Sequence, residues 1–93
     1  MAELASLQAV VRGQVHGVFY RAFVESHAQE LHLTGYVRNL PEERVEVVAE
    51  GDKKNLEKLA ELLKKGPPAA KVLSVEVVWG KFTGESPQFN IKY

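Results

Sequence analysis

The sequence predicts an α+β domain in which two helices cover one face of an antiparallel sheet. Two observations predict this class. Apolar residues alternate with period two in several short segments, which is typical of strands, and recur at helical spacing in two longer ones. These segments follow one another in the order β-α-β-β-α-β. The chain has 93 residues, of which 45% are hydrophobic, and this suits one compact domain over residues 1–93.

The first half of the chain supplies a strand, a helix and a hairpin. The run SLQAVVRG (residues 6–13) alternates imperfectly and ends at a glycine, as expected of a strand about six residues long. Residues 19–31 predict the first helix, because Ala22, Phe23, His27 and Leu31 lie near helical spacing. The β-rich runs GYVRNL and RVEVVAEG flank Pro-Glu-Glu, so we expect a β-hairpin over residues 36–50.

The second half supplies a helix and the closing strands. Asp52 is a candidate N-cap, and apolar residues then recur at i, i+3, i+4 and i+7 until Gly66-Pro67-Pro68: Leu56, Leu59, Ala60 and Leu63. Two further runs place apolar residues on one face at period two: Leu73, Val75, Val77 and Trp79 in the first, and Phe89, Ile91 and Tyr93 in the second. The complete order predicts a ferredoxin-like β-α-β-β-α-β sandwich, an antiparallel sheet with two helices on one face.

Composition excludes several classes of function. The absence of cysteine excludes disulfides, cysteine-based zinc sites and a thiol nucleophile, so we expect a reducing, cytoplasmic setting. Twelve basic and twelve acidic side chains balance, which argues against a broad phosphate-neutralising surface for nucleic acid. The chain shows neither a signal peptide nor a long apolar run, so we expect no membrane partner. A monomer is the expected state.

The stretch GQVHGVFYR (residues 13–21) connects the first strand to the first helix and is the main functional candidate. Gly13 and Gly17 bracket a turn that can aim consecutive backbone N–H groups at one point, beside the positive end of the helix dipole. Arg21, in the first helical turn, could hold a phosphate by two charge-assisted hydrogen bonds. The alternative is an ordinary glycine turn with Arg21 in solvent, since neither the P-loop nor the dinucleotide-binding pattern is met.

A second stretch, LTGYVRNL (residues 33–40), favours the functional interpretation. Together the two stretches resemble the signature motifs of the acylphosphatase family. The first motif is Gly, any residue, Val-Gln-Gly-Val, any residue, an aromatic and Arg, and residues 13–21 match it except at His16. The second is Gly, an aromatic, Val, usually a basic residue, and Asn, and Gly35 to Asn39 match it. The resemblance covers nearly the whole chain.

The resemblance implies hydrolysis of acyl phosphates, mixed carboxylic–phosphoric anhydrides, to a carboxylate and inorganic phosphate. Arg21 would bind the phosphoryl group and Asn39 would orient the attacking water, with no metal and no organic cofactor. Backbone N–H groups would complete the phosphoryl site, at Val15, His16, Gly17, Val18, Phe19 and Tyr20. Inorganic phosphate or sulfate is expected to bind as a product-like ligand. The leaving carboxylate needs no proton, because the pKa of its conjugate acid is roughly 4–5.

Other interpretations remain open from the residues alone. Asn39 precedes LPEE, where asparagine commonly belongs to a turn. His27 and His32 lie five apart, which disfavours a shared helical face and therefore a metal site. An RNA-binding domain would need stacking rings that RVEVVAE lacks. A regulatory module that binds an anion without turnover could keep Arg21 and dispense with Asn39.

Three residues depart from the family pattern. His16 stands where glutamine is usual: its ring either faces the ligand, where protonation would add a positive charge, or points outward and packs under the loop. His32 and Glu43 stand where glycine is common, at the end of the first helix and in the hairpin turn. Both are therefore expected at positive φ, which histidine tolerates modestly and glutamate less well.

Overall fold

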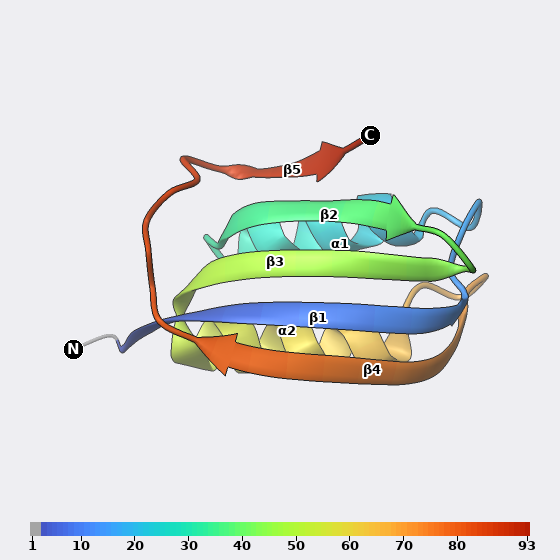
Figure 1. Cartoon of the computed structure of the whole chain (residues 1–93), viewed down its shortest axis with the longest axis horizontal. Helices are drawn as coiled ribbons and strands as arrows, with labels where there is room; N and C mark the ends of the chain where they lie inside the picture. The colour runs from blue at the N-terminus through green and yellow to red at the C-terminus, as the bar shows by residue number, and fades with distance from the viewer. Residues whose placement is uncertain (1–2) are drawn as a thin grey trace.

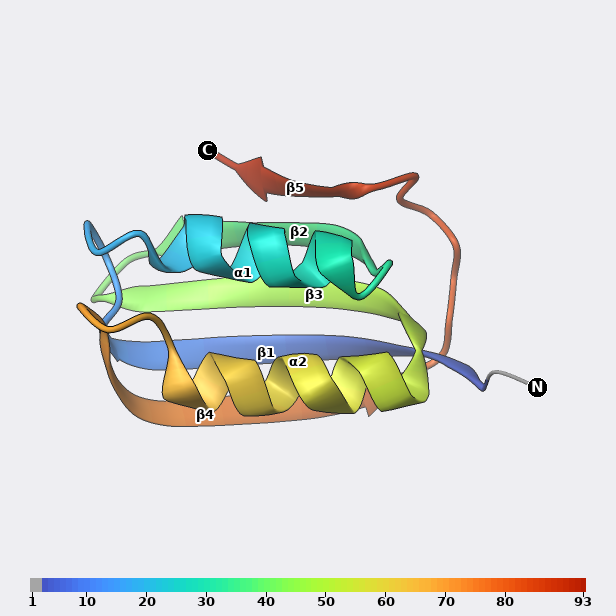
Figure 2. The same cartoon turned by 180° about the vertical axis from the view of Figure 1, so that it is seen from behind.

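The structure, a computed structural model, describes residues 3–93; the predicted span of 1–93 also includes residues 1 and 2, which lie outside the described residues. Two helices cover one face of a five-stranded sheet (Figures 1 and 2). The elements are β1 (Leu4–Gln14), α1 (Tyr20–Glu30), β2 (Thr34–Leu40), β3 (Arg44–Asp52), α2 (Lys53–Lys65), β4 (Lys71–Gly80) and β5 (Phe89–Lys92). The predicted ferredoxin-like order is confirmed. Neither α1 nor α2 is long and apolar enough to cross a membrane.

The strands lie in the order β4-β1-β3-β2-β5. Neighbours among β4, β1, β3 and β2 pair antiparallel, as predicted. The strand β5 instead pairs parallel to β2, with Gly35 opposite Phe89 and Arg38 opposite Lys92. The sheet is therefore mixed, and residues 81–88 carry the chain along one end of the sheet to reach the outer edge of β2 (Figure 1).

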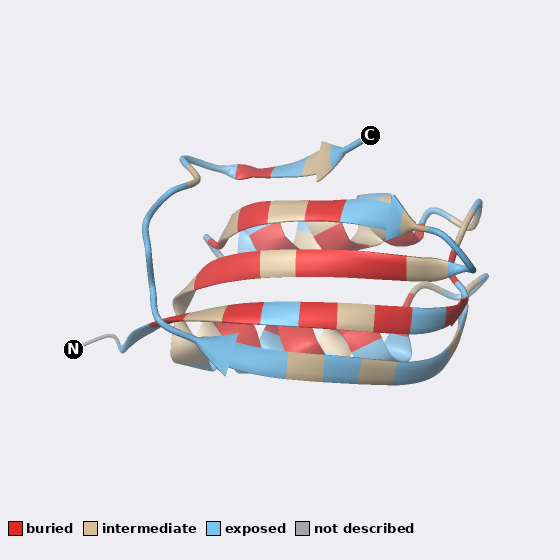
Figure 3. Ribbon diagram, viewed as in Figure 1, coloured by how far each residue is buried: buried red, intermediate tan, exposed pale blue. Residues whose placement is uncertain are grey.

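The hydrophobic core lies between the sheet and the helices. Alternate residues of β1 and β3 pair with one another and are buried, Leu7 with Ala49, Ala9 with Val47 and Val11 with Val45. The two helices cover them with buried residues: Tyr20, Val24 and Ala28 from α1, and Leu56, Leu59, Ala60 and Leu63 from α2 (Figure 3). The four apolar positions predicted for the second helix are thus all in the core.

The buried face of α1 differs from the one that the sequence predicts. Ala22 is exposed, while Phe23 and His27 are only half-buried and stack edge to face, with ring centres 4.5 Å apart. The buried residues recur at i, i+4 and i+8, starting from Tyr20. Tyr20 can be the first residue of this buried face because its hydroxyl donates a hydrogen bond to the Leu63 carbonyl oxygen (2.8 Å), so its polar atom is paired in the core.

Leu73 is the second exception to the predicted pattern. Val75, Val77 and Trp79 share the face that looks toward the helices, as predicted, but Leu73 is 74% exposed. The pairing of β1 with β4 shifts by one residue between Arg12 and Gly13, so Leu73 is the extra residue of a β-bulge. A Cβ atom at Gly13 would lie 2.1 Å from the Lys71 carbonyl oxygen, so this close approach requires glycine.

The turns and the second helix cap agree with the sequence predictions. His32 (φ 57°) and Glu43 (φ 55°) both have the predicted positive φ, and Glu42 (φ 64°) shares it. Two successive left-handed glutamates therefore make the β2–β3 turn. Asp52 caps α2 as predicted, because its Oδ1 accepts a hydrogen bond from the Lys54 N–H at 2.9 Å.

A buried carboxylate, Glu50 of β3, attaches the segment before β5 to the uncovered face of the sheet. Its oxygens accept hydrogen bonds from the Thr83 N–H, the Thr83 hydroxyl and the Gly84 N–H, at 2.9 to 3.1 Å. Burial alone would raise the pKa of the Glu50 carboxyl, but these hydrogen bonds outweigh it and lower the pKa below its ordinary value. The ionised carboxylate is thus the form that the folded protein stabilises.

Glu50→Gln should reduce the loss of stability in acid. A carboxyl whose pKa is lowered by folding contributes stability above its unfolded pKa and loses this contribution as the pH falls through the folded value. The free energy of unfolding, measured in urea between pH 6 and pH 3, should therefore fall less steeply for this variant, which starts less stable at pH 6. Glu57→Gln, on the exposed side of α2, is the control. An unchanged slope for Glu50→Gln would contradict the assignment.

Candidate active site

The connection between β1 and α1, residues 15–19, forms a backbone cradle at one end of the sheet. Val15 is buried and ties the start of the connection to the core. Gly17 (φ 67°) and Phe19 (φ 60°) both adopt left-handed conformations, and such alternation turns successive N–H groups toward one side. The Val15 N–H is engaged, since it donates to the Gly13 carbonyl oxygen at 3.0 Å. Within residues 3–93, no hydrogen bond engages the N–H groups of residues 16–20, which leaves them available to an anion.

Tyr20 fixes the position of this cradle. It is the first residue of α1, it is 1% exposed, and its hydroxyl donates to the Leu63 carbonyl oxygen of α2. Burial raises the pKa of the Tyr20 phenol well above its ordinary value, so the hydroxyl stays protonated. Tyr20 therefore holds the N-terminus of α1 against α2, and its polar atom is occupied there.

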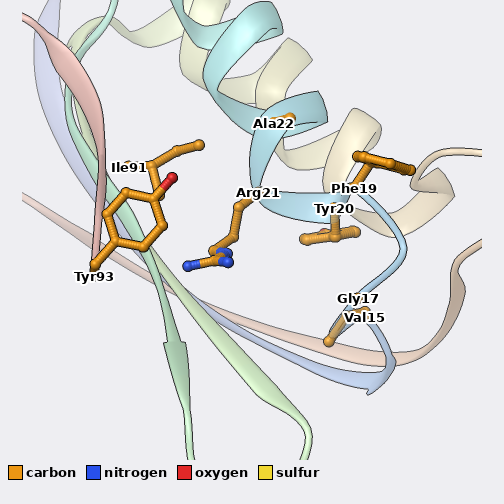
Figure 4. Close-up of a pocket in the computed structure, with 8 residues that line it drawn as sticks. All are labelled: Val15, Gly17, Phe19, Tyr20, Arg21, Ala22, Ile91 and Tyr93. Carbon is orange, nitrogen blue, oxygen red and sulfur yellow. The ribbon is translucent and has the colours of Figure 1, made fainter.

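Arg21 lies at the centre of a pocket of about 290 Å³. The pocket is lined by Val15, Gly17, Phe19, Tyr20, Arg21, Ala22, Ile91 and Tyr93 (Figure 4). The half-buried Arg21 side chain extends from α1 between Tyr20 and Tyr93, and its Cζ lies 5.0 Å from the centre of the Tyr93 ring. None of the ion pairs in the described part of the chain involves Arg21. Its guanidinium group therefore has donors free for an anionic ligand.

Asn39 lies on the same face of the sheet and at the same end as this pocket. It pairs with the buried Val45 and follows the buried Val37 by two residues, so its side chain looks toward the helix layer. Because Arg38 lies opposite Lys92, the residues that follow, Asn39 and Tyr93, are neighbours on that face. Asn39 is exposed and is outside the set of residues that line the pocket. The structure thus places Asn39 beside the pocket, on the same face and at the same end of the sheet, but outside its lining.

The His16 side chain joins the cradle to the β2–β3 hairpin. Its Nε2 lies 2.7 Å from the Arg44 carbonyl oxygen, and since a carbonyl only accepts, Nε2 carries the proton. The Gly13 N–H also donates to the Glu43 carbonyl oxygen at 3.4 Å. The imidazole is half-buried and does not line the pocket. This contact favours the interpretation in which His16 packs under the loop over the one in which its ring faces the ligand.

Three pocket residues were not identified as site residues from the sequence: Ala22, Ile91 and Tyr93. Ile91 and Tyr93 complete the wall opposite the cradle. Their period-two pattern indicated a strand, but the parallel pairing of β5 with β2 that brings them to Arg21 has no local signal. Within residues 3–93, no three His, Asp or Glu side chains form a group that could hold a metal ion.

The family model and the curated relatives that match this chain are described as acylphosphatases. The family model described as Acylphosphatase matches residues 7–91. A Thermus thermophilus acylphosphatase is 55% identical over 78 residues, which are 84% of this chain and 89% of that protein. The crystal structure of an acylphosphatase from Bacillus subtilis superposes with a TM-score of 0.91 at 34% identity, covering 98% of this chain and all of that one. Full-length HypF, described as phosphate- and nucleotide-bound, matches with a TM-score of 0.89 at 26% identity; all of this chain covers 12% of HypF.

The His16 contact predicts a difference between two substitutions. His16→Ala removes the donor to the Arg44 carbonyl oxygen and should lower the free energy of unfolding by about 1 kcal/mol. Amide exchange of Val15 and Phe23, whose N–H groups donate to the Gly13 and Phe19 carbonyl oxygens at the two ends of the connection, should also accelerate, because the cradle loses its attachment to the hairpin. His16→Gln keeps a side-chain N–H and should retain most of both properties. Equal losses in the two variants would show that the hydrogen bond does not hold the cradle.

Proposed function

We propose that the pocket around Arg21 is the active site of this chain, which belongs to the acylphosphatase family and hydrolyses small-molecule acyl phosphates. The observation that carries this proposal is the combination of an arginine without an ion-pair partner in residues 3–93 and a run of free backbone N–H groups. Both lie at the N-terminus of α1, where the helix dipole favours negative charge.

In this proposal the phosphoryl group sits between Arg21 and the cradle. The guanidinium fork donates two charge-assisted hydrogen bonds, and the N–H groups of residues 16–20 receive the remaining oxygens. The charge that develops on the equatorial oxygens during transfer is stabilised by the same fixed donors, with no covalent intermediate and no metal or organic cofactor. Inorganic phosphate and sulfate occupy the same place as product-like ligands, in keeping with the phosphate-bound description of HypF.

Asn39 is the proposed water-positioning residue. Its amide is neutral and therefore orients a water molecule rather than deprotonating it. A water held on the helix-facing side of β2 can attack phosphorus in line with the departing carboxylate. That carboxylate leaves without protonation, so the site needs no general acid. The water that Asn39 positions would lie at the edge of the pocket, because Asn39 is on the same face and at the same end of the sheet but outside the lining.

The proposed setting is a cytoplasmic monomer formed by one domain over residues 1–93, without nucleic-acid partners. The lack of cysteine supports a reducing compartment. The uncovered face of the sheet carries two buried carboxylates on the central strand β3, Glu46 and Glu50, where a nucleic-acid platform would need stacking rings and positive charge.

Substitutions of the two proposed catalytic residues should have different effects. Arg21→Ala should weaken competitive inhibition by inorganic phosphate and also slow turnover, because one guanidinium binds the phosphoryl group in both ground and transition states. Asn39→Ala should mainly lower kcat, by roughly 10²–10³-fold, because it removes one positioned contact to the attacking water. Steady-state kinetics with acetyl phosphate and phosphate inhibition constants measure both effects.

Arg12→Ala is the matched control for this pair, since Arg12 is an exposed arginine on the uncovered face of β1. It should leave kcat and phosphate inhibition within about twofold of the unmodified protein. If Arg21→Ala and Asn39→Ala weakened phosphate inhibition equally, the division of roles would be wrong.

Turnover should be independent of divalent metal ions. The proposed site stabilises the phosphoryl charge with a guanidinium and backbone donors alone. Exhaustive chelation, followed by assay in metal-free buffer, should therefore preserve kcat. Loss of activity on chelation with recovery on adding magnesium or zinc would contradict this mechanism.

A further inference from the structure

We infer that Glu25 of α1 is a positioning residue for the proposed active site, because its carboxylate holds the end of β5 so that the Tyr93 ring stands over the Arg21 guanidinium. The inference rests on the proposed function, since it takes Arg21 as the residue that binds the phosphoryl group. Glu25 is outside the lining of the pocket, and neither sequence motif contains it. It would therefore act on the site without contact with the substrate.

One stripe of α1 faces β5. Three of its residues recur at i, i+4 and i+8, each one position after a buried residue of the helix: Arg21, Glu25 and Gln29. Glu25 Oε2 accepts a hydrogen bond from the Ile91 N–H at 3.2 Å. Gln29 Nε2 donates a hydrogen bond to the Phe89 carbonyl oxygen at 3.0 Å. These two bonds attach the helix to the strand, and the Arg21–Tyr93 contact lies at the end of the same row (Figure 4).

The position of Tyr93 depends on such an attachment. β5 has only four residues and lies at the edge of the sheet, with a neighbouring strand on one side. Its pairing with β2 ends where Lys92 lies opposite Arg38, so Tyr93 follows the last pair. Tyr93 is 99% exposed, so packing in the core does not hold its ring. The direction in which the preceding residues leave the sheet therefore sets the position of this ring.

Glu25 is the side chain that can set this direction. It bonds the backbone two residues before Tyr93, and it lies one helical turn after Arg21. One carboxylate thus joins the strand that carries the ring to the helix that carries the guanidinium. A ring against the face of a guanidinium group restricts its orientation and leaves the N–H donors in its plane free for an oxyanion. The hydrogen bond from β5 to Glu25 would therefore preorganise Arg21 for its ligand.

A direct ion pair is the alternative role for Glu25. Its i, i+4 spacing from Arg21 would permit one. Within residues 3–93, however, none of the ion pairs joins these two side chains, and a carboxylate oxygen of Glu25 is bound to the Ile91 N–H. The contribution of Glu25 should therefore depend on its acceptor oxygen and its length, and not on its negative charge.

The experiment measures kcat/KM for acetyl phosphate and the inhibition constant of inorganic phosphate in the full chain and its variants. Glu25→Ala should lower kcat/KM and raise the inhibition constant by about two- to fivefold each, which is the size of an exposed cation–ring contact. Glu25→Gln keeps an acceptor oxygen at the same reach and should retain both constants. Glu25→Asp keeps the charge but is shorter by one methylene group, so it should resemble Glu25→Ala.

Gln29→Ala is the matched control. It removes the other bond between α1 and β5, but at Phe89, which is buried and lies at the far end of the strand from the pocket. It should lower the free energy of unfolding and leave both constants unchanged. All variants are assayed at a temperature at which circular dichroism shows them folded, so that a purely structural role would not change the inhibition constant.

A double-mutant cycle tests whether Glu25 acts through Tyr93. Tyr93→Ala should cause the same loss as Glu25→Ala, and combining the two substitutions should cause no further loss. Losses that multiply, equal losses in Glu25→Gln and Glu25→Ala, or unchanged constants in both Glu25→Ala and Glu25→Asp would each overturn the inference. Unchanged phosphate inhibition in Arg21→Ala would instead contradict the proposed function.

Discussion

The hydrogen bond from Tyr20 to the Leu63 carbonyl oxygen is the constraint on which the site depends. It joins the first residue of α1 to the last turn of α2, in the interior of the protein. With the N-terminus of α1 fixed in this way, the preceding left-handed residues can expose their N–H groups at one place, and the next residue, Arg21, is aimed into the pocket. Backbone N–H groups bind an anion most strongly when they are held in position before the anion arrives, because the donors then need no reorganisation.

Arg21 and Arg38 have different roles because they lie on opposite faces of the sheet. Arg38, on the uncovered face, donates to Glu46 at 2.6 Å, and Gln8 donates to the same carboxylate. Burial would raise the pKa of Glu46, but these hydrogen bonds lower it, so the pair is fully ionised and satisfied near neutral pH. Arg21 has no such partner within residues 3–93. Of these two arginines, the one on the helix-bearing face is therefore free to bind a ligand, while the one on the uncovered face stabilises the sheet.

Most of the fold follows from local patterns in the sequence, and the exceptions have tertiary causes. Period-two and helical spacing located every strand and helix, because one face of each element is buried. The exposure of Leu73 was not predictable, since the bulge arises where Gly13 meets the backbone of β4. The sequence predicted the wrong buried face for α1, because the burial of Tyr20 depends on a hydrogen bond from its hydroxyl to α2, which no local pattern indicates. The direction of β5 depends on the path of residues 81–88, and this segment has no periodic pattern of apolar residues from which the path could be predicted.

The candidate site was only partly predictable for similar reasons. The motifs supplied Arg21 and Asn39, since the chemistry depends on residue type and order along the chain. They did not show that the His16 ring bonds the Arg44 carbonyl oxygen, or that Tyr93 stands against Arg21. Both contacts join segments far apart in the sequence.

The sheet order has a similar consequence for the kinetics of folding. β1 pairs with both β3 and β4, so Leu7 must meet Trp79, 72 residues along the chain (79 − 7). Pairings of this kind close long loops before they gain contacts, and such topologies fold slowly compared with helical bundles of the same size. Formation of this sheet therefore requires contacts across most of the chain, which favours a folding rate below that of a helical bundle of this length.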